Sequence, residues 1–211
     1  MTSSTTTNAD ASARKSAIPT LLTVFRIAMG PAIAALVLWA ANDLHTDPLL
    51  SGFIYALAFI LFLLAASTDW LDGYLARKWN AVTPLGAALD HAADKVLITC
   101  VLVALAYAAL PMHLVAAAVL ILGRDVAVAG LREGLSAQGK SLPVSQLGKW
   151  KAAAEMAGVA AFLAYQSAAL LSAGASVVIG LDWAATVLLW AAAGLALLSG
   201  AQYVSALLNR N

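Results

Sequence analysis

Charged residues are scarce in this chain. Only 11% of its 211 residues are Asp, Glu, Lys or Arg, whereas 62% are apolar, and the mean hydropathy is +0.85. Soluble domains carry about 25% charged residues, so this composition cannot cover the surface of a soluble globule. A formal net charge of +1 also provides no broad basic face. These absences exclude an ordinary soluble enzyme, a disordered chain and a nucleic-acid-binding protein, and they predict an integral membrane protein.

The chain contains a single cysteine, and its first residues do not resemble a signal peptide. The single cysteine, Cys100, cannot form a disulfide within the chain. The first 17 residues are polar and rich in Ser and Thr, and they hold no apolar core with a cleavage site as a signal peptide would. We predict that residues 1–17 form a disordered or surface-lying cytoplasmic tail; an organelle transit segment is the alternative.

Long apolar runs, separated by short polar breaks, fill the rest of the chain. About 20 residues are needed to cross the hydrocarbon core of a bilayer. Six runs reach that length, at residues 19–41, 49–77, 83–110, 113–136, 149–173 and 179–208. Neither an internal repeat nor a soluble domain is visible. The sequence therefore predicts an all-α integral membrane protein, with residues 18–211 forming one six-transmembrane-helix bundle.

The distribution of basic residues predicts the orientation of this bundle. The breaks at 42–48, 110–113 and 173–182 contain no Lys or Arg, whereas the connections at 77–84 and 132–151 are basic. Basic residues also occur near both termini. Because cytoplasmic loops are enriched in Lys and Arg, we expect both termini and the two basic connections to be cytoplasmic, in a bacterial-type cytoplasmic membrane.

Four aspartates lie within 26 residues of one another: Asp69, Asp72, Asp90 and Asp94. Spacings of three and four residues place each pair on one helix face. If the connection near 79–83 is the tip of an antiparallel hairpin, the two pairs face each other roughly 10–16 Å below it. Four carboxylates at that depth cannot all stay ionised unless a cation joins them.

An all-oxygen set of this kind favours Mg²⁺, Mn²⁺ or Ca²⁺ over Zn²⁺, and four acids can hold the paired ions used in phosphoryl transfer. The alternative is that Arg77, Lys78 and Lys95 neutralise the acids, or that the acids are protonated. The small residues Gly73 and Ala76 leave room for a bulky ligand beside the helix, although close helix packing also favours small residues. Arg77 adds a planar donor group suited to a phosphate.

Together these residues read Asp69-x-x-Asp72-Gly73-x-x-Ala76-Arg77 and, after eight further residues, Gly86-x-x-x-Asp90-x-x-x-Asp94. In this pattern the chain resembles the CDP-alcohol phosphatidyltransferase family at every defined position. The resemblance implies a six-helix membrane enzyme, usually a homodimer, that displaces CMP from a CDP-linked lipid with an alcohol nucleophile. It implies two divalent ions, Mg²⁺ or Mn²⁺, on the four aspartates, and Asp94 as the general base. It implies CDP binding by Asp69, Asp72, Gly73, Ala76, Arg77 and Gly86.

Looser motifs resemble the phosphatidylglycerophosphate synthase branch of that family. They are residues 18–23 with Arg26, 68–70, 93–96, 123–125, 131–133 and 148–151. This resemblance implies CDP-diacylglycerol and glycerol 3-phosphate as substrates, in a site that is open to the cytoplasm and laterally to lipid. The motifs are partly shared with cardiolipin and phosphatidylserine synthases, which remain alternatives. The chain departs from the usual pattern at His91, where Pro is common, and at Ala152–Ala153, where Thr is usual.

Basic residues near the cytoplasmic ends of the helices are candidates for binding the phosphate of an anionic acceptor. They are Arg124, Arg132, Lys149 and Lys151, with Arg26 behind them. For Arg124 the alternative is a structural ion pair with an acid on another helix, such as Glu155. For the others it is contact with lipid headgroups.

A cation channel or transporter is the competing class of function, because such proteins also place acids within the membrane. However, all four aspartates lie in the predicted cytoplasmic half, and the outer halves of the spans are nearly free of charge. Inverted repeats are absent as well. A scaffold protein would give no reason for four aligned carboxylates. The sequence therefore favours the enzyme.

Overall fold

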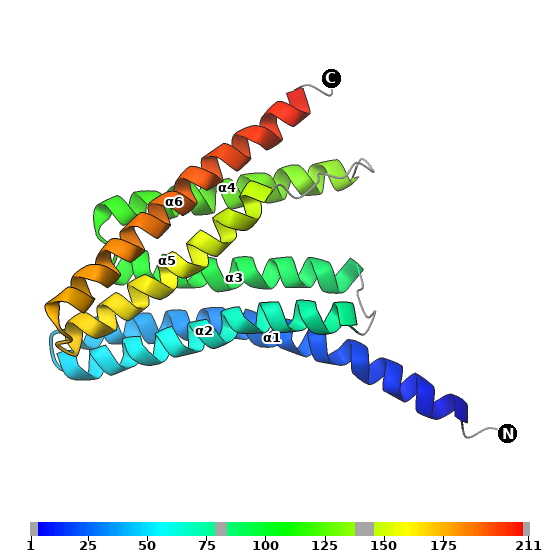
Figure 1. Cartoon of the computed structure of the whole chain (residues 1–211), viewed down its shortest axis with the longest axis horizontal. Helices are drawn as coiled ribbons and strands as arrows, with labels where there is room; N and C mark the ends of the chain where they lie inside the picture. Colours follow the sequence, from blue (N-terminus) through cyan, green and yellow to red (C-terminus); the bar gives the residue numbers. More distant parts are fainter. Residues whose placement is uncertain (1–3, 79–83, 138–145, 209–211) are drawn as a thin grey trace.

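The computed structural model describes residues 4–78, 84–137 and 146–208, and it places the side chains of residues 21–68, 89–137, 146–203 and 205. The described residues form six helices and no strand (Figure 1). The helices are α1 (Ser4–Asp43), α2 (Pro48–Lys78), α3 (Pro84–Ala108), α4 (Met112–Ala137), α5 (Gln146–Leu170) and α6 (Ala175–Leu208). The predicted all-α, six-helix architecture is confirmed.

Three short turns join the helices at the end of the bundle that lies opposite the two termini (Figure 1). We call this the turn end, and the opposite end the terminal end. Proline fits the first position of a helix because its missing N–H has no partner there, and Pro48 begins α2 in this way. The preceding Asp47 caps the helix, because its Oδ1 accepts a hydrogen bond from the Leu50 N–H at 2.9 Å. At the turn between α5 and α6, Ser172 adopts a left-handed φ of 56°.

Five stretches of the described residues are long and apolar enough to cross a membrane: Leu21–Asp43, Pro48–Thr68, Leu89–Ala108, Met112–Ala137 and Ala175–Tyr203. The predicted fifth span, α5, is not among them. It has the same length as α3, 25 residues, but it buries the charged residues Lys151 and Glu155 within the bundle. Large apolar side chains such as Val119 and Trp183 are 63% and 65% exposed on the outside of the bundle. An apolar exterior of this kind is the surface of an integral membrane protein.

The backbone of the predicted N-terminal tail is helical where the structure describes it. Helix α1 runs without interruption from Ser4, so the backbone of residues 4–17 is helical and continuous with the first span. In Figure 1 these first turns of α1 extend beyond the other helices.

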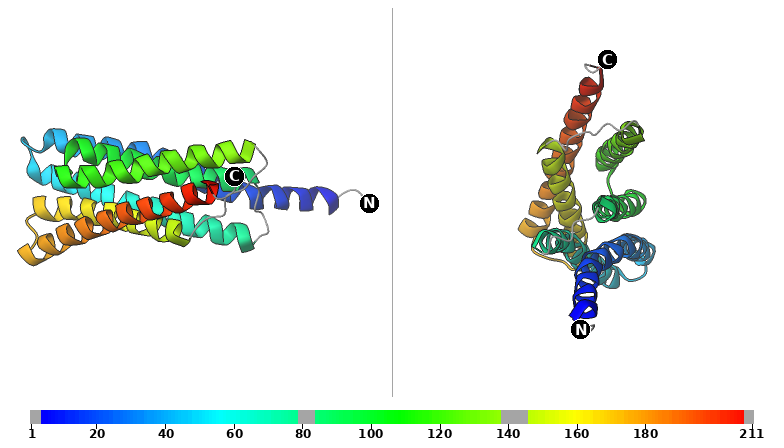
Figure 2. Two further views of the ribbon diagram at one scale, coloured as in Figure 1. Left: turned by 90° about the horizontal axis from the view of Figure 1, so that it is seen from above. Right: turned by 90° about the vertical axis from the view of Figure 1, so that its right-hand side faces the viewer.

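The six helices form a ring. Helix α1 packs against both α2 and α3, α5 packs against α2 and α6, and α6 packs against α4, whereas α3 and α4 have little contact. Seen end on, α1, α3 and α4 form one side of the ring, and α2, α5 and α6 form the other (Figure 2). The apolar core fills the half of the ring nearer the turn end, where it includes Val37, Phe62, Leu105 and Phe162.

Helix α1 packs against both α2 and α3, and the described residues of α2 and α3 have few contacts with each other. How the two predicted aspartate pairs lie relative to each other falls outside the described side chains. Gly30 allows α1 to pack closely against α3. A Cβ atom at residue 30 would lie only 3.0 Å from Leu97 Cα and 3.1 Å from the Val96 carbonyl oxygen on α3. Glycine therefore lets the two backbones approach more closely than any other residue would.

We expect Gly30→Ala to separate α1 from α3, because backbone atoms cannot move aside as the end of a flexible side chain can. Overpacking of this kind costs about 1–3 kcal/mol, so the variant should melt at a lower temperature in detergent. Gly194→Ala is the matched control, since a Cβ atom there meets nothing within 4 Å. Equal melting temperatures for both variants would contradict this account of the contact.

Candidate active site

A fully buried arginine joins α1 to the first turns of α3. The Arg26 side chain is 0% exposed, and its Nη1 donates hydrogen bonds to Asp90 Oδ1 at 2.9 Å and to Asp94 Oδ1 at 2.7 Å. A buried guanidinium is strongly destabilising unless carboxylates pair with it. The two aspartates of α3 supply that pairing, and they lie one helical turn apart as their spacing predicts.

These two carboxylates provide half of the predicted metal site. Their Oδ1 atoms converge on a single positively charged nitrogen, which shows that the backbone of α3 can direct both oxygens to one cation. Oxygen donors suit Mg²⁺ or Mn²⁺. Among the residues with described side chains, no three His, Cys, Asp or Glu residues come together as a metal site.

The other half of the predicted site lies outside the described side chains. The backbone of α2 is helical through Asp69 and Asp72, so the two residues share a helix face. The remaining predicted residues without described side chains are Gly73, Ala76, Arg77 and Gly86. Their assigned roles stay predictions.

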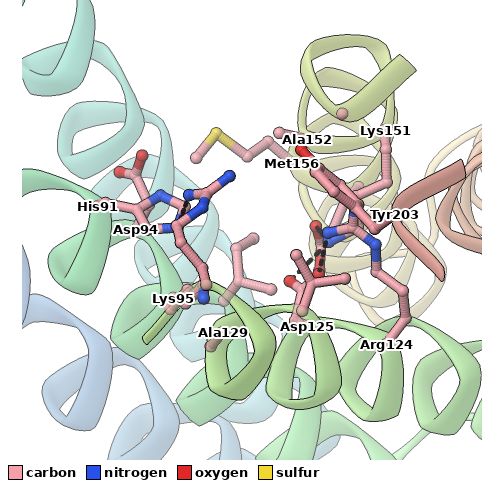
Figure 3. Close-up of a pocket in the computed structure, with 15 residues that line it drawn as sticks. His91, Asp94, Lys95, Arg124, Asp125, Ala129, Lys151, Ala152, Met156 and Tyr203 are labelled. Atoms are coloured by element: carbon pink, nitrogen blue, oxygen red, sulfur yellow. Dashed lines mark hydrogen bonds and ion pairs between the residues drawn. The ribbon is translucent and has the colours of Figure 1, made fainter. Parts of the chain in front are cut away.

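A cavity of about 170 Å³ opens beside Asp94, at the terminal end of the bundle and between α3, α4, α5 and α6 (Figure 3). It lies where α3 and α4 have little contact. Its charged lining consists of Lys95, Arg124, Arg132 and Lys151 together with Asp94, Asp125 and Glu155. Figure 3 shows His91 and Asp94 on one side of the cavity, and Arg124, Lys151 and Tyr203 on the other.

Three charged groups form a network in the wall that α4 and α5 contribute. Lys151 Nζ donates to Asp125 Oδ2 and lies within salt-bridge distance of Glu155 Oε2, at 2.6 Å in both cases. The Lys151 and Glu155 side chains are each 4% exposed, so this wall is almost dry. The predicted alternative in which Arg124 pairs with Glu155 is wrong. Glu155 pairs with Lys151, because residues four apart lie on the same face of a helix.

The Arg124 side chain forms hydrogen bonds with a residue of α6 and with the next residue of its own helix, α4. Its Nη2 donates to Ser199 Oγ at 2.9 Å, and its Nη1 donates to Asp125 Oδ1 at 3.1 Å. The guanidinium carbon lies 5.7 Å from the centre of the Tyr203 ring, within the range of a cation–π interaction. These contacts fix the arginine at the cavity wall.

Two buried N–H donors in this cavity lack a hydrogen-bond acceptor among the described residues. They are the Nε atoms of Arg124 and Arg132. The Arg132 Nη1 lies 3.3 Å from His91 Nε2, so that part of its guanidinium is in contact with α3. Because buried donors are almost always satisfied, a ligand group that accepts hydrogen bonds fits this part of the lining.

The structure therefore brings together three of the five predicted acceptor-binding residues, Arg124, Arg132 and Lys151. Lys149 is exposed and does not line the cavity. Arg26 lies instead between Asp90 and Asp94. Five residues of the site were not predicted from the sequence: Lys95, Asp125, Glu155, Ser199 and Tyr203. Of these, Glu155 carried a usable signal, its spacing of four from Lys151.

Comparison with known proteins agrees with this arrangement. The sequence profile of the CDP-alcohol phosphatidyltransferases matches residues 16–200. The CDP-diacylglycerol--glycerol-3-phosphate 3-phosphatidyltransferase of Cereibacter sphaeroides is 40% identical over 144 residues, which cover 68% of this chain and 61% of that protein. The protein of the same name from Rickettsia bellii is 36% identical over 189 residues, 90% of this chain and 94% of that protein.

A further relative is the cardiolipin synthase (CMP-forming) of Oryza sativa subsp. japonica. It is 34% identical over 203 residues, which cover 89% of this chain and 56% of the rice protein. The chain thus spans less than two thirds of the Cereibacter and rice relatives, but nearly the full length of the Rickettsia relative.

We expect Arg26→Met to destabilise the bundle, because it leaves Asp90 and Asp94 without their shared cation. The two carboxylates are 38% and 29% exposed, so the cost should be smaller than the about 3–5 kcal/mol of a fully buried pair. Thermal unfolding in detergent with a chelator present measures the effect. Lys149→Met, at an exposed position on α5, is the control and should melt like the unmodified protein. If both variants melted alike, Arg26 would not stabilise the bundle as its contacts indicate.

Proposed function

Because the chain belongs to the CDP-alcohol phosphatidyltransferase family, we propose that it transfers the phosphatidyl group of CDP-diacylglycerol to glycerol 3-phosphate. The products are phosphatidylglycerophosphate and CMP. The observation that carries this choice of acceptor is the cationic cavity beside Asp94, with its two buried arginine N–H donors that lack an acceptor. The names of the Cereibacter and Rickettsia relatives support the same acceptor.

In the proposed reaction, a hydroxyl oxygen of glycerol 3-phosphate attacks the phosphorus atom that carries the diacylglycerol. A new P–O bond forms while the bond from that phosphorus to the CMP oxygen breaks, and CMP leaves with the electron pair. The hydroxyl proton passes to the carboxylate of Asp94, which lines the cavity and would act as general base.

The four aspartates would hold two divalent ions, Mg²⁺ or Mn²⁺. When bound, these ions would neutralise charge on the diphosphate and stabilise the departing CMP. The convergence of Asp90 and Asp94 on one cationic group supports this role. Asp69, Asp72, Gly73, Ala76, Arg77 and Gly86 would bind the CDP group.

The acceptor phosphate would bind on the far side of the cavity from Asp94. Arg124 has a buried Nε donor there that lacks an acceptor among the described side chains, and Lys151 adds positive charge from α5. Arg132, whose Nη1 lies 3.3 Å from His91 Nε2, would approach the phosphate from the α3 side of the cavity. Separating the phosphate from the general base keeps two negative charges apart. It also leaves the attacking hydroxyl, at the opposite end of glycerol 3-phosphate, beside Asp94.

We infer further that the terminal end of the bundle faces the cytoplasm and that the protein is a homodimer. The orientation is supported by the turns at 44–47, 109–111 and 171–174, which contain no Lys or Arg and lie at the opposite end of the bundle. A water-soluble acceptor would then reach the cavity from the cytoplasm. The dimer is supported by the family resemblance.

Phosphatidylglycerol is the second candidate acceptor, because the rice relative is named a cardiolipin synthase (CMP-forming). That acceptor also presents a hydroxyl and a phosphate. Unlike glycerol 3-phosphate, it brings two acyl chains that must stay in the bilayer.

A panel of acceptors distinguishes these candidates. Purified protein in detergent, supplied with CDP-diacylglycerol and Mg²⁺ or Mn²⁺, should release CMP when glycerol 3-phosphate is added. It should release far less with phosphatidylglycerol or serine, and none in excess chelator. CMP release with phosphatidylglycerol but not with glycerol 3-phosphate would identify phosphatidylglycerol as the acceptor. Substantial turnover in excess chelator would contradict the proposed metal site.

Substitutions separate the proposed base from the proposed phosphate site. Asp94→Asn should lower kcat by about 10²–10⁴, while the Kd for the CDP-lipid changes little. Arg132→Ala should instead raise KM for the acceptor more than KM for the CDP-lipid. Steady-state kinetics with each substrate varied in turn measures both effects. Near-normal kcat in Asp94→Asn, or an unchanged acceptor KM in Arg132→Ala, would contradict the corresponding assignment.

A further inference from the structure

Glu155 lines the cavity with only one of its two oxygens engaged. Its side chain is 4% exposed, and Oε2 lies 2.6 Å from Lys151 Nζ. Its other oxygen, Oε1, is buried and has no hydrogen-bond partner among the residues whose side chains are described. A buried carboxylate oxygen requires a donor, so Oε1 can accept a hydrogen bond from an O–H or N–H group of a ligand in the cavity.

The two nearby cations already have partners. Lys151 bridges to Asp125 as well as to Glu155, and Arg124 donates to Asp125 and Ser199. These contacts keep Oε2 occupied and leave Oε1 as the oxygen available to a ligand.

The unsatisfied groups of the cavity are of two opposite kinds. The Nε atoms of Arg124 and Arg132 are donors without an acceptor, and Glu155 Oε1 is an acceptor without a donor. An anion alone would accept hydrogen bonds from the two arginine Nε atoms and leave Glu155 Oε1 without a donor. A ligand that carries both an anionic group and a hydroxyl would satisfy all three.

We propose that Glu155 Oε1 accepts a hydrogen bond from the middle-carbon hydroxyl of the acceptor, and so selects a polyol phosphate over a simple hydroxyalkyl phosphate. This inference rests on the proposed function. With the phosphate on the arginines and the terminal hydroxyl beside Asp94, the middle hydroxyl of glycerol 3-phosphate is the donor that remains. Glu155 is then a specificity-determining residue, and Lys151 positions it by holding Oε2.

The test compares glycerol 3-phosphate with 3-hydroxypropyl phosphate, which keeps the attacking hydroxyl and the phosphate but lacks the middle hydroxyl. We expect the unmodified protein to favour glycerol 3-phosphate by about tenfold or more in kcat/KM, because a site built to bond a hydroxyl rejects an analogue without one. In Glu155→Met this ratio should fall towards one. Glu133→Met, which removes an exposed glutamate of α4 outside the cavity, is the matched control and should keep the ratio.

The outcomes separate this assignment from the proposed function. Equal use of the two acceptors by the unmodified protein would overturn the role of Glu155, whether or not the variant folds. Equal losses with both acceptors in Glu155→Met, at an unchanged ratio, would also overturn it and leave a purely structural residue. CMP release with neither acceptor, but with phosphatidylglycerol, would overturn the proposed function and this assignment together. If the methionine variant does not fold, Glu155→Gln should still lower the ratio, because a neutral amide oxygen is a weaker acceptor.

Discussion

The structure depends on the pairing of charges that are buried inside an apolar bundle. Arg26 has no exposed surface, and the carboxylates of Asp90 and Asp94 hold it between α1 and α3. Lys151, between Asp125 and Glu155, does the same for α4 and α5. An unpaired charge in either place would be more costly than the loss of most apolar contacts. The ion pairs therefore fix the relative positions of the helices in the half of the ring that the apolar core does not fill.

This division of the bundle determines where a ligand can bind. At the turn end, residues such as Phe62 and Leu105 pack into a continuous core with no exposed surface. At the terminal end, the same helices carry charged side chains, and α3 and α4 have little contact with each other. A polar cavity results without any irregular segment of backbone within the described helices.

Much of this arrangement is visible in the sequence. The polar breaks predict six helices, because proline and capping residues stand where the apolar runs stop. The spacing of four between Asp90 and Asp94 predicts their shared face, and the same spacing accounts for Lys151 and Glu155. Periodicity within one helix reports which residues share a face, and it says nothing of which helix lies opposite that face.

The sequence therefore does not predict which helices pack against each other. The close approach of α1 to α3 occurs at Gly30, one of 14 glycines with nothing in the sequence to distinguish it. The contact of Arg124 with Ser199 joins residues 75 positions apart and depends on the register of α6. The position of the Asp69 and Asp72 carboxylates relative to α3 is still a prediction from spacing.

The sparse contact between α3 and α4 also has a mechanical consequence. Parting these two helices removes little buried surface, whereas parting any other neighbouring pair in the ring separates closely packed side chains. The cohesion of the ring is therefore lowest at this seam. The cavity borders the same seam, since α3 contributes His91, Asp94 and Lys95 to its lining, and α4 contributes Arg124, Asp125 and Arg132.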